Sequence, residues 1–207
     1  MLSRRILLAA ACSAILWDRT ALAADPLDDL LARVARARAS VRTMQGPFTQ
    51  VRTLGLLATE VRSSGTLILV RPDRLRWELA PPDQITFFVG PEGVAYRDAR
   101  GQTRMQGANT RMAAALDDLR TLLAGDIGRL RDRWDLRVLR DDGTGAEVDA
   151  LPKTASSSPL RGLRFTLAPD LIRPTRALLV EGPRDRTVIE FGALLVDAPV
   201  DPARVRP

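Results

Sequence analysis

The sequence predicts an α+β fold in a single domain, with roughly ten strands and two or three helices. Three observations lead to this prediction. Apolar residues near the start of the chain recur with a helical period, whereas from residue 48 onward most runs are short, rich in β-forming residues and separated by Gly, Pro and Asp. The connections between these runs are too short for crossover helices, so neighbouring strands are expected to pair antiparallel.

The first helix is predicted over residues 26–42. Asp25 stands where an N-cap is expected, Pro26 occupies the first turn, and acidic residues follow where the helix dipole favours negative charge. Gly46-Pro47 is expected to end the segment. The apolar face of this helix comprises Leu27, Leu30, Leu31, Val34, Ala37 and Val41.

Six strands are predicted next. In one of them Leu75, Trp77 and Leu79 alternate with charged residues, which makes one face apolar and the other solvated. Turn signals containing proline flank it on both sides. These strands cover residues 48–54, 60–71, 75–79, 85–89, 94–97 and 103–106.

A second helix is predicted over residues 109–123, where apolar residues again form a stripe, and Gly125 is expected to end it. A brief helical turn is expected at 126–131. The tail at 198–207 contains three prolines and is expected to be irregular. Five more strands are predicted over residues 134–139, 146–151, 163–167, 176–181 and 188–191.

Residues 1–23 have the pattern of an export signal, which leaves 24–207 as the mature domain in the periplasm. Arg4 and Arg5 precede an apolar run that is too short to span a bilayer, and Ala21-Leu22-Ala23 fits signal peptidase. Two other readings of the leader stay open. The paired arginines also fit twin-arginine export, and the stretch before Cys12 weakly resembles a lipoprotein box.

Composition excludes several classes of function. The chain has no histidine, and Cys12 lies in the predicted leader, so the mature domain has no histidine or thiolate for catalysis or metal binding, and no cofactor is expected. Loss of the leader lowers the net charge from +6 to +4, because three arginines and one aspartate leave with it. That charge is spread along the chain, so no nucleic-acid partner is expected. The pairs Asp117-Asp118 and Asp141-Asp142 are interpreted as solvated charges, which predicts no enzymatic activity.

An open curved sheet must have its concave apolar face covered, here by the helices. A tight fit between them gives an ordinary core, whereas a loose fit leaves a hydrophobic cavity. Composition alone favours the ordinary core.

A resemblance to a known family favours the cavity. Phe48-Thr49-Gln50, the run from Gly65-Thr66-Leu67 to Arg71-Pro72 and Trp77, and Pro82-Asp83-Gln84 together resemble the outer-membrane lipoprotein carrier family LolA. The combination is fairly specific, although each fragment alone is weak. The resemblance is good over residues 27–97 and looser up to Phe191.

The resemblance implies a curved antiparallel half-barrel of about 10–11 strands with helices over its concave face. It implies a monomeric periplasmic carrier that takes lipoprotein acyl chains from an inner-membrane ABC transporter complex and passes them to an outer-membrane receptor. Arg71 matches the family's lid-latching arginine, whose guanidinium can donate to carbonyls at a helix end. The residues expected at the acyl cavity are Leu67, Leu69, Leu75, Trp77, Leu79, Val89, Met112 and Leu119.

Two departures from the family leave the cargo open. Leu75 replaces an aromatic residue of the family's cavity, and the C-terminal segment is short. Both features resemble a divergent LolA-like branch, for which a polyene lipid or glycolipid is an alternative cargo. A periplasmic sensor or interaction module on the same fold is the other alternative, although such proteins normally carry a second domain.

Overall fold

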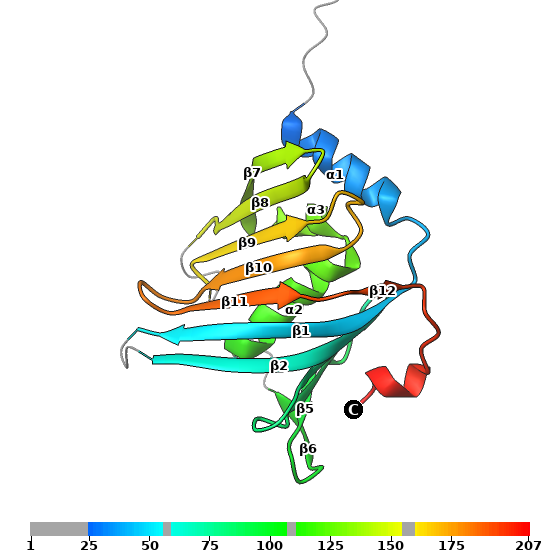
Figure 1. Cartoon of the computed structure of the whole chain (residues 1–207), viewed down its shortest axis with the longest axis vertical. Helices are drawn as coiled ribbons and strands as arrows, with labels where there is room; N and C mark the ends of the chain where they lie inside the picture. Colours follow the sequence, from blue (N-terminus) through cyan, green and yellow to red (C-terminus); the bar gives the residue numbers. More distant parts are fainter. Residues whose placement is uncertain (1–24, 56–58, 107–110, 155–159) are drawn as a thin grey trace, which may run out of the picture.

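The computed structural model describes residues 25–55, 59–106, 111–154 and 160–207, and of residues 106, 111 and 112 it describes the backbone but not the side chains. The predicted leader lies outside these residues. Within them, strands of one large antiparallel sheet alternate with few helices, so the predicted α+β class is confirmed (Figure 1). The sheet is curved and open, with helices on one face.

The helices are α1 (Pro26–Ala37), α2 (Arg111–Ala124) and α3 (Ile127–Leu130), with a 3₁₀ turn η1 (Pro202–Val205). The strands are β1 (Thr43–Leu54), β2 (Thr59–Val70), β3 (Arg74–Leu79), β4 (Thr86–Gly90), β5 (Gly93–Arg97), β6 (Thr103–Gln106), β7 (Trp134–Asp142), β8 (Gly145–Pro152), β9 (Gly162–Leu167), β10 (Pro174–Val180), β11 (Arg186–Phe191) and β12 (Leu195–Val196).

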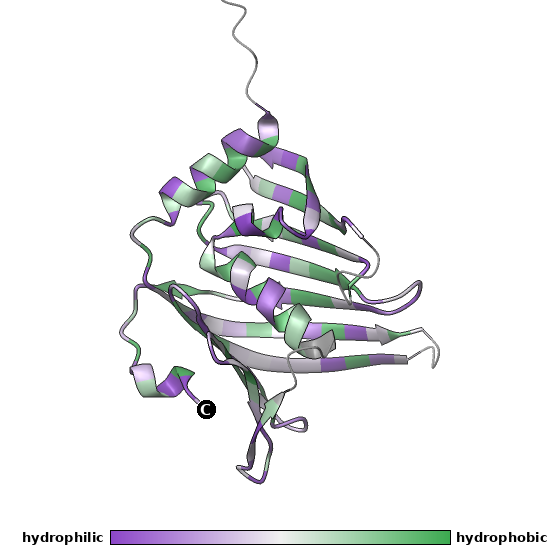
Figure 2. Ribbon diagram, turned by 180° about the vertical axis from the view of Figure 1, so that it is seen from behind, coloured by the Kyte–Doolittle hydropathy of each residue, from purple (hydrophilic) through white to green (hydrophobic). Residues whose placement is uncertain are grey.

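The order of the strands explains where the helices lie. In the described part of the chain the sheet runs β6-β5-β4-β3-β2-β1-β11-β10-β9-β8-β7, and β12 pairs with β1. β6 and β7 are therefore opposite edges, and the segment that joins them must cross the whole sheet. α2 and α3 form that crossing, and Figure 2 shows α2 running diagonally in front of the strands.

The face beneath α2 holds the hydrophobic core. Because side chains alternate along a strand, Phe48, Leu67, Leu75 and Trp77 all point to this face, and each is at most 3% exposed. The Phe48 and Trp77 rings stack with centroids 3.7 Å apart. The core is thus built on the inner face of β1–β4 and continues over β8–β11.

α1 ends earlier than predicted, at Ala37, and the chain re-enters the sheet at Thr43. The expectation that Gly46-Pro47 ends the segment is wrong, because both residues lie inside β1. The Pro47 carbonyl accepts a hydrogen bond from Gly192 N at 2.9 Å, so the missing N–H of Pro47 faces the same side. On that side of β1, β11 has already ended and β12 has not yet begun, so the missing N–H of Pro47 removes no hydrogen bond between strands.

α1 lies along the β7 edge of the sheet (Figure 1). Its first turn is capped as predicted, because Asp25 Oδ1 accepts from Leu27 N at 3.0 Å. Arg33 forms an ion pair with Asp141 of β7. The helix therefore covers an edge that would otherwise expose unpaired backbone groups.

The tail is more ordered than predicted. Asp201 caps η1 by accepting from Ala203 N at 2.9 Å, and Val205 of this turn is only 2% exposed. η1 packs against β2 and β3 on the face away from α2, where Ile68 is also buried. The apolar Val205 anchors the tail in spite of its prolines.

We expect that Gly65→Ala lowers the free energy of unfolding by about 2 kcal/mol, as typical of overpacking. A Cβ on Gly65 would lie 2.0 Å from the Glu78 carbonyl oxygen and 2.6 Å from Phe48 Cζ. Urea unfolding monitored by tryptophan fluorescence measures the effect. Gly128→Ala is the control, because a Cβ there meets nothing within 4 Å. Equal stability of the two variants would contradict the crowding at Gly65.

Candidate functional site

A small cavity lies between α2 and the inner face of the sheet. Its volume is about 80 Å³ in this structure. Apolar side chains from both α2 and the strands line most of it, so its lining is mainly hydrophobic. These apolar residues are Trp77, Leu79, Phe87, Ala115, Leu116, Leu119, Leu179 and Ile189.

The residues expected at an acyl cavity divide into two groups. Trp77, Leu79 and Leu119 line the space beneath α2. Four others are buried in the core outside its lining, each at most 2% exposed: Leu67, Leu69, Leu75 and Val89. The side chain of Met112 lies outside the described residues.

This division follows from the position of each residue along its strand. All of these sheet residues share the inner face, so alternation alone does not separate cavity from core. Sequence reasoning missed Phe87, although its register opposite Trp77 places it on the same wall. It also missed Ile189 on β11, which pairs with β1 only in the folded sheet, and Leu179 on β10, one strand farther.

Polar side chains form one end of the cavity lining. Gln50 and Arg52 come from β1, Thr187 from β11, and Glu181 directly follows β10. Arg52 Nη2 lies 3.6 Å from Glu181 Oε2, so an ion pair spans this end of the cavity.

Arg71 lies at the end of α1. Its Nη1 donates to the carbonyl oxygens of Arg38 and Val41, the latter at 3.1 Å. Both carbonyls belong to the C-terminal end of α1 and the turn that follows it. A guanidinium is suited to this place, because the last carbonyls of a helix have no partners within the helix.

Arg38 makes the corresponding contacts to α2, and sequence reasoning missed it. Its side chain is 2% exposed, and Nη1 donates to the carbonyl oxygens of Leu122 and Leu123 at 2.8 and 3.3 Å. Nε donates to the Leu171 carbonyl oxygen at 3.1 Å. Burial lowers the pKa of Arg38 to about 10. The sequence signal for its burial is its spacing from Val34, because position 38 continues the apolar face of α1.

The two arginines form a chain of contacts from the sheet to α2. Arg71, directly after β2, fixes the end of α1, and Arg38 at the end of α1 fixes the end of α2. Gly125, at φ +85°, makes room for this arrangement, since a Cβ there would lie 2.6 Å from Arg38 Cδ. The hydrogen bonds from the buried Arg38 side chain therefore fix the C-terminal end of α2.

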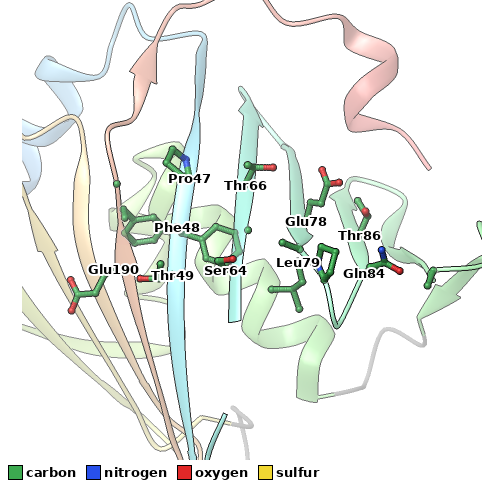
Figure 3. Close-up of a pocket in the computed structure, with 16 residues that line it drawn as sticks. Pro47, Phe48, Thr49, Ser64, Thr66, Glu78, Leu79, Gln84, Thr86 and Glu190 are labelled. Carbon is green, nitrogen blue, oxygen red and sulfur yellow. The ribbon is translucent and has the colours of Figure 1, made fainter. Parts of the chain in front are cut away.

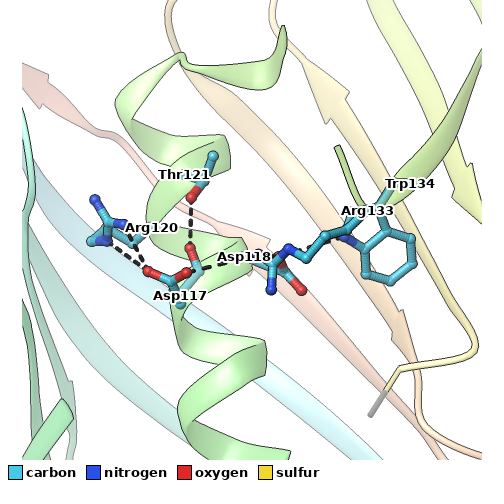
Figure 4. A network of polar contacts seen from close by, with 6 residues as sticks. All are labelled: Asp117, Asp118, Arg120, Thr121, Arg133 and Trp134. Atoms are coloured by element: carbon cyan, nitrogen blue, oxygen red, sulfur yellow. Dashed lines mark hydrogen bonds and ion pairs between the residues drawn. The ribbon is translucent and has the colours of Figure 1, made fainter. Parts of the chain in front are cut away.

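Asp118 holds α2 from a second side (Figure 4). It forms an ion pair with Arg133, and Trp134 Nε1 donates to its Oδ1 at 3.5 Å. The interpretation of Asp118 as a solvated charge is wrong, because it is 1% exposed. Burial raises its pKa to about 6, with Asp117 also raising it and Arg133 and Trp134 opposing the shift. Asp118 faces the helix–strand contact and does not line the cavity.

A larger, open hollow lies on the outer face of the sheet, with a volume of about 820 Å³ (Figure 3). Polar side chains that alternate with the core residues, among them Thr49, Thr66, Glu78 and Glu190, line it together with apolar ones such as Phe48 and Leu79. This mixed lining differs from the mainly apolar wall beneath α2, which is the better match to an apolar ligand.

In the described part of the chain, none of the helices combines the length and the apolar character that crossing a membrane requires. No group of three or more acidic, histidine or cysteine side chains there is placed to hold a metal ion.

The family comparison gives one match. The family described as outer membrane lipoprotein carrier protein LolA matches residues 39–204, which is most of the chain. Comparison with curated proteins gives no match.

Several solved structures have a similar fold. An uncharacterized conserved protein from Thermus thermophilus has a TM-score of 0.53 at 9% identity, covering 87% of this chain and 93% of that one. MucB has a TM-score of 0.52 at 16% identity, covering 87% and 62%. A DUF1329 family protein from Desulfovibrio piger has a TM-score of 0.50 at 12% identity, covering 88% and 98%.

At these identities the likeness shows the fold alone. This chain spans 62% of the length of the MucB chain. MucB from Pseudomonas aeruginosa was also solved in a complex with MucA.

Proposed function

Since the chain belongs to the LolA family of outer membrane lipoprotein carrier proteins, we propose that it is a periplasmic lipid carrier. It shields the acyl chains of lipoproteins, or of a related lipid, between α2 and the inner face of the sheet. It receives this cargo from an ABC transporter complex at the inner membrane and delivers it to a receptor at the outer membrane. The protein acts as a monomer and without catalysis.

The observation that carries this proposal is the apolar cavity beneath α2. Apolar side chains line it on both the helix and the sheet, and it lies where an open half-barrel is covered by its helix. An apolar wall suits a carrier, because it accepts acyl chains without demanding particular polar partners.

The cavity must enlarge to accept cargo. A volume of about 80 Å³ is well below the roughly 300–1,000 Å³ that is typical of ligand pockets. The cavity is therefore narrow in this structure. The contacts of Arg38 and Asp118 lie on the second half of α2, so we place the opening at its first half, where Ala115 lines the cavity.

A cavity that closes when empty also fits the energetics of transfer. Each buried methylene contributes about 0.8 kcal/mol relative to water, but almost nothing relative to a membrane. A carrier that exchanges cargo between two membranes must therefore hold it only about as well as a membrane does. Collapse of the empty cavity lowers net affinity, because the apolar wall must be separated before cargo enters.

We expect that Ala115→Trp weakens binding of the fluorescent fatty acid parinaric acid at least ten-fold. Ala115 lines the cavity, and an indole there fills the small space that remains. Fluorescence titration of residues 24–207 measures the dissociation constant. Ala114→Trp is the matched control, because Ala114 is next to Ala115 but is half-buried and does not line the cavity.

Two results would contradict the carrier proposal. One is wild-type protein that binds no acyl probe under any condition. The other is equal weakening by Ala115→Trp and Ala114→Trp, which would place the probe elsewhere. A protein that binds no lipid but captures a single membrane-protein partner would fit the sensor role instead.

A further inference from the structure

The polar end of the cavity is built from four neighbouring positions on β1, on β11 and directly after β10. Gln50 and Arg52 follow Phe48 on the inner face of β1, because alternate residues share a face. Thr187 pairs directly with Arg52 and precedes the inward Ile189 on β11. Glu181 follows Leu179 at the same spacing, so all four side chains reach the cavity.

The ion pair at this end is weakly held. Arg52 Nη2 and Glu181 Oε2 are 3.6 Å apart, whereas a direct charge-assisted hydrogen bond measures about 2.7–2.9 Å. The Arg52 side chain is 45% exposed and that of Glu181 28%. Separating such a pair costs little, because water and salt already screen it.

The two members of the pair differ in how they are anchored. Arg52 lies within β1, which has β2 on one side and β11 on the other. Glu181 lies one residue beyond the end of β10, where the chain turns toward Asp185. The Glu181 N–H still donates to the Asp185 carbonyl oxygen at 2.9 Å, so opening this end requires only that the Glu181 side chain rotates away from Arg52.

We infer that this end of the cavity binds the anionic head group, phosphate or carboxylate, of an acylated ligand, with Glu181 occupying its place in the empty protein. This inference rests on the proposed carrier function and names the chemistry of the cargo. Arg52 donates to the anion, and the Gln50 amide and the Thr187 hydroxyl supply further donors beside it. The acyl chain then lies along Trp77 and Leu119.

Calorimetric titration with three ligands of equal chain length tests this inference. Myristoyl lysophosphatidylglycerol carries a phosphate, myristate a carboxylate, and monomyristoylglycerol no charge. We expect that Arg52→Gln weakens binding of the charged ligands about ten-fold and that Glu181→Gln tightens it about three-fold. Binding of monomyristoylglycerol is expected to stay within two-fold in both variants.

The control is a pair of the same charges on the opposite face of the sheet. Arg176 and Glu190 form an ion pair at 2.8 Å on the outer side of β10 and β11. Arg176→Gln and Glu190→Gln make the same changes in net charge. Because this pair lies outside the cavity lining, both variants are expected to bind all three ligands as the wild-type protein does. A response confined to the phosphate ligand or to myristate supports the inference and tells which anion is the source.

Three results would overturn the inference. If all three ligands bind and the Arg52 and Arg176 variants behave alike, no head-group site exists, although the carrier proposal survives. The inference also fails, and the carrier proposal survives, if Glu181→Gln weakens binding of the charged ligands or leaves it unchanged. If no ligand binds wild-type protein, the carrier proposal and this inference both fail.

Discussion

Replacing Arg38 with methionine is expected to lower the free energy of unfolding by about 3 kcal/mol and to loosen α2 over the cavity. The variant loses three hydrogen bonds, to the carbonyl oxygens of Leu122, Leu123 and Leu171. The Leu122 oxygen keeps a donor in Gly125 N at 3.2 Å, whereas those of Leu123 and Leu171 lose theirs. Each unsatisfied group costs about 1–3 kcal/mol. Methionine keeps much of the aliphatic volume, so the change removes chiefly the donors.

Removing a buried charge offsets part of this loss of stability. Arg38 is buried, and burial lowers its pKa to about 10, which means that its charge is costly to hold there. Buried ion pairs can be replaced by apolar residues without loss of stability. Here, however, the partners are backbone carbonyls that stay in place after the substitution. The unsatisfied carbonyls therefore outweigh the relief of desolvation.

Urea unfolding measures the stability of Arg38→Met, and stopped-flow mixing with parinaric acid measures how fast the cavity opens. We expect lower stability together with faster probe entry. Arg36→Met on the same helix is the control, because Arg36 is exposed. A variant as stable as wild type, or one with unchanged probe entry, would show that Arg38 does not restrain α2.

Much of the fold could be predicted because its signals are local. The apolar period of α1 and α2 and the alternation in β3 each lie within a few residues, and both were read correctly. Pro47 was misread for the opposite reason. A proline normally ends a segment, and only the break between β11 and β12, far away in the sequence, makes its missing N–H harmless.

The site was less predictable, because its members meet only through the sheet. Trp77 and Leu67 are paired neighbours on one face, yet only Trp77 reaches the cavity. Arg52 and Glu181 lie far apart in the chain and come together because β11 lies between β1 and β10. Arg38 is one of many arginines in this sequence, and its burial depends on where α2 ends.

Asp118→Asn is expected to remove a dependence of stability on pH that the wild-type protein shows between about pH 4 and 6. Burial raises the pKa of Asp118 in the folded protein to about 6, above its ordinary 3.8. Folding therefore favours the protonated acid. Its contribution to stability is full below the unfolded pKa and is lost as the pH rises through the folded one.

The wild-type protein should consequently lose about 2 kcal/mol relative to Asp118→Asn between pH 4.5 and 7.5, as linkage requires for a pKa near 6. Urea unfolding of both proteins across this range measures the difference, and other titrating groups cancel in the comparison. Asp117→Asn controls for the loss of one charge on α2, because the Asp117 side chain is 42% exposed. A difference between wild type and Asp118→Asn that stays constant with pH would mean that Arg133 and Trp134 compensate the buried carboxylate fully. The ion pair would then hold α2 equally well at every pH in this range.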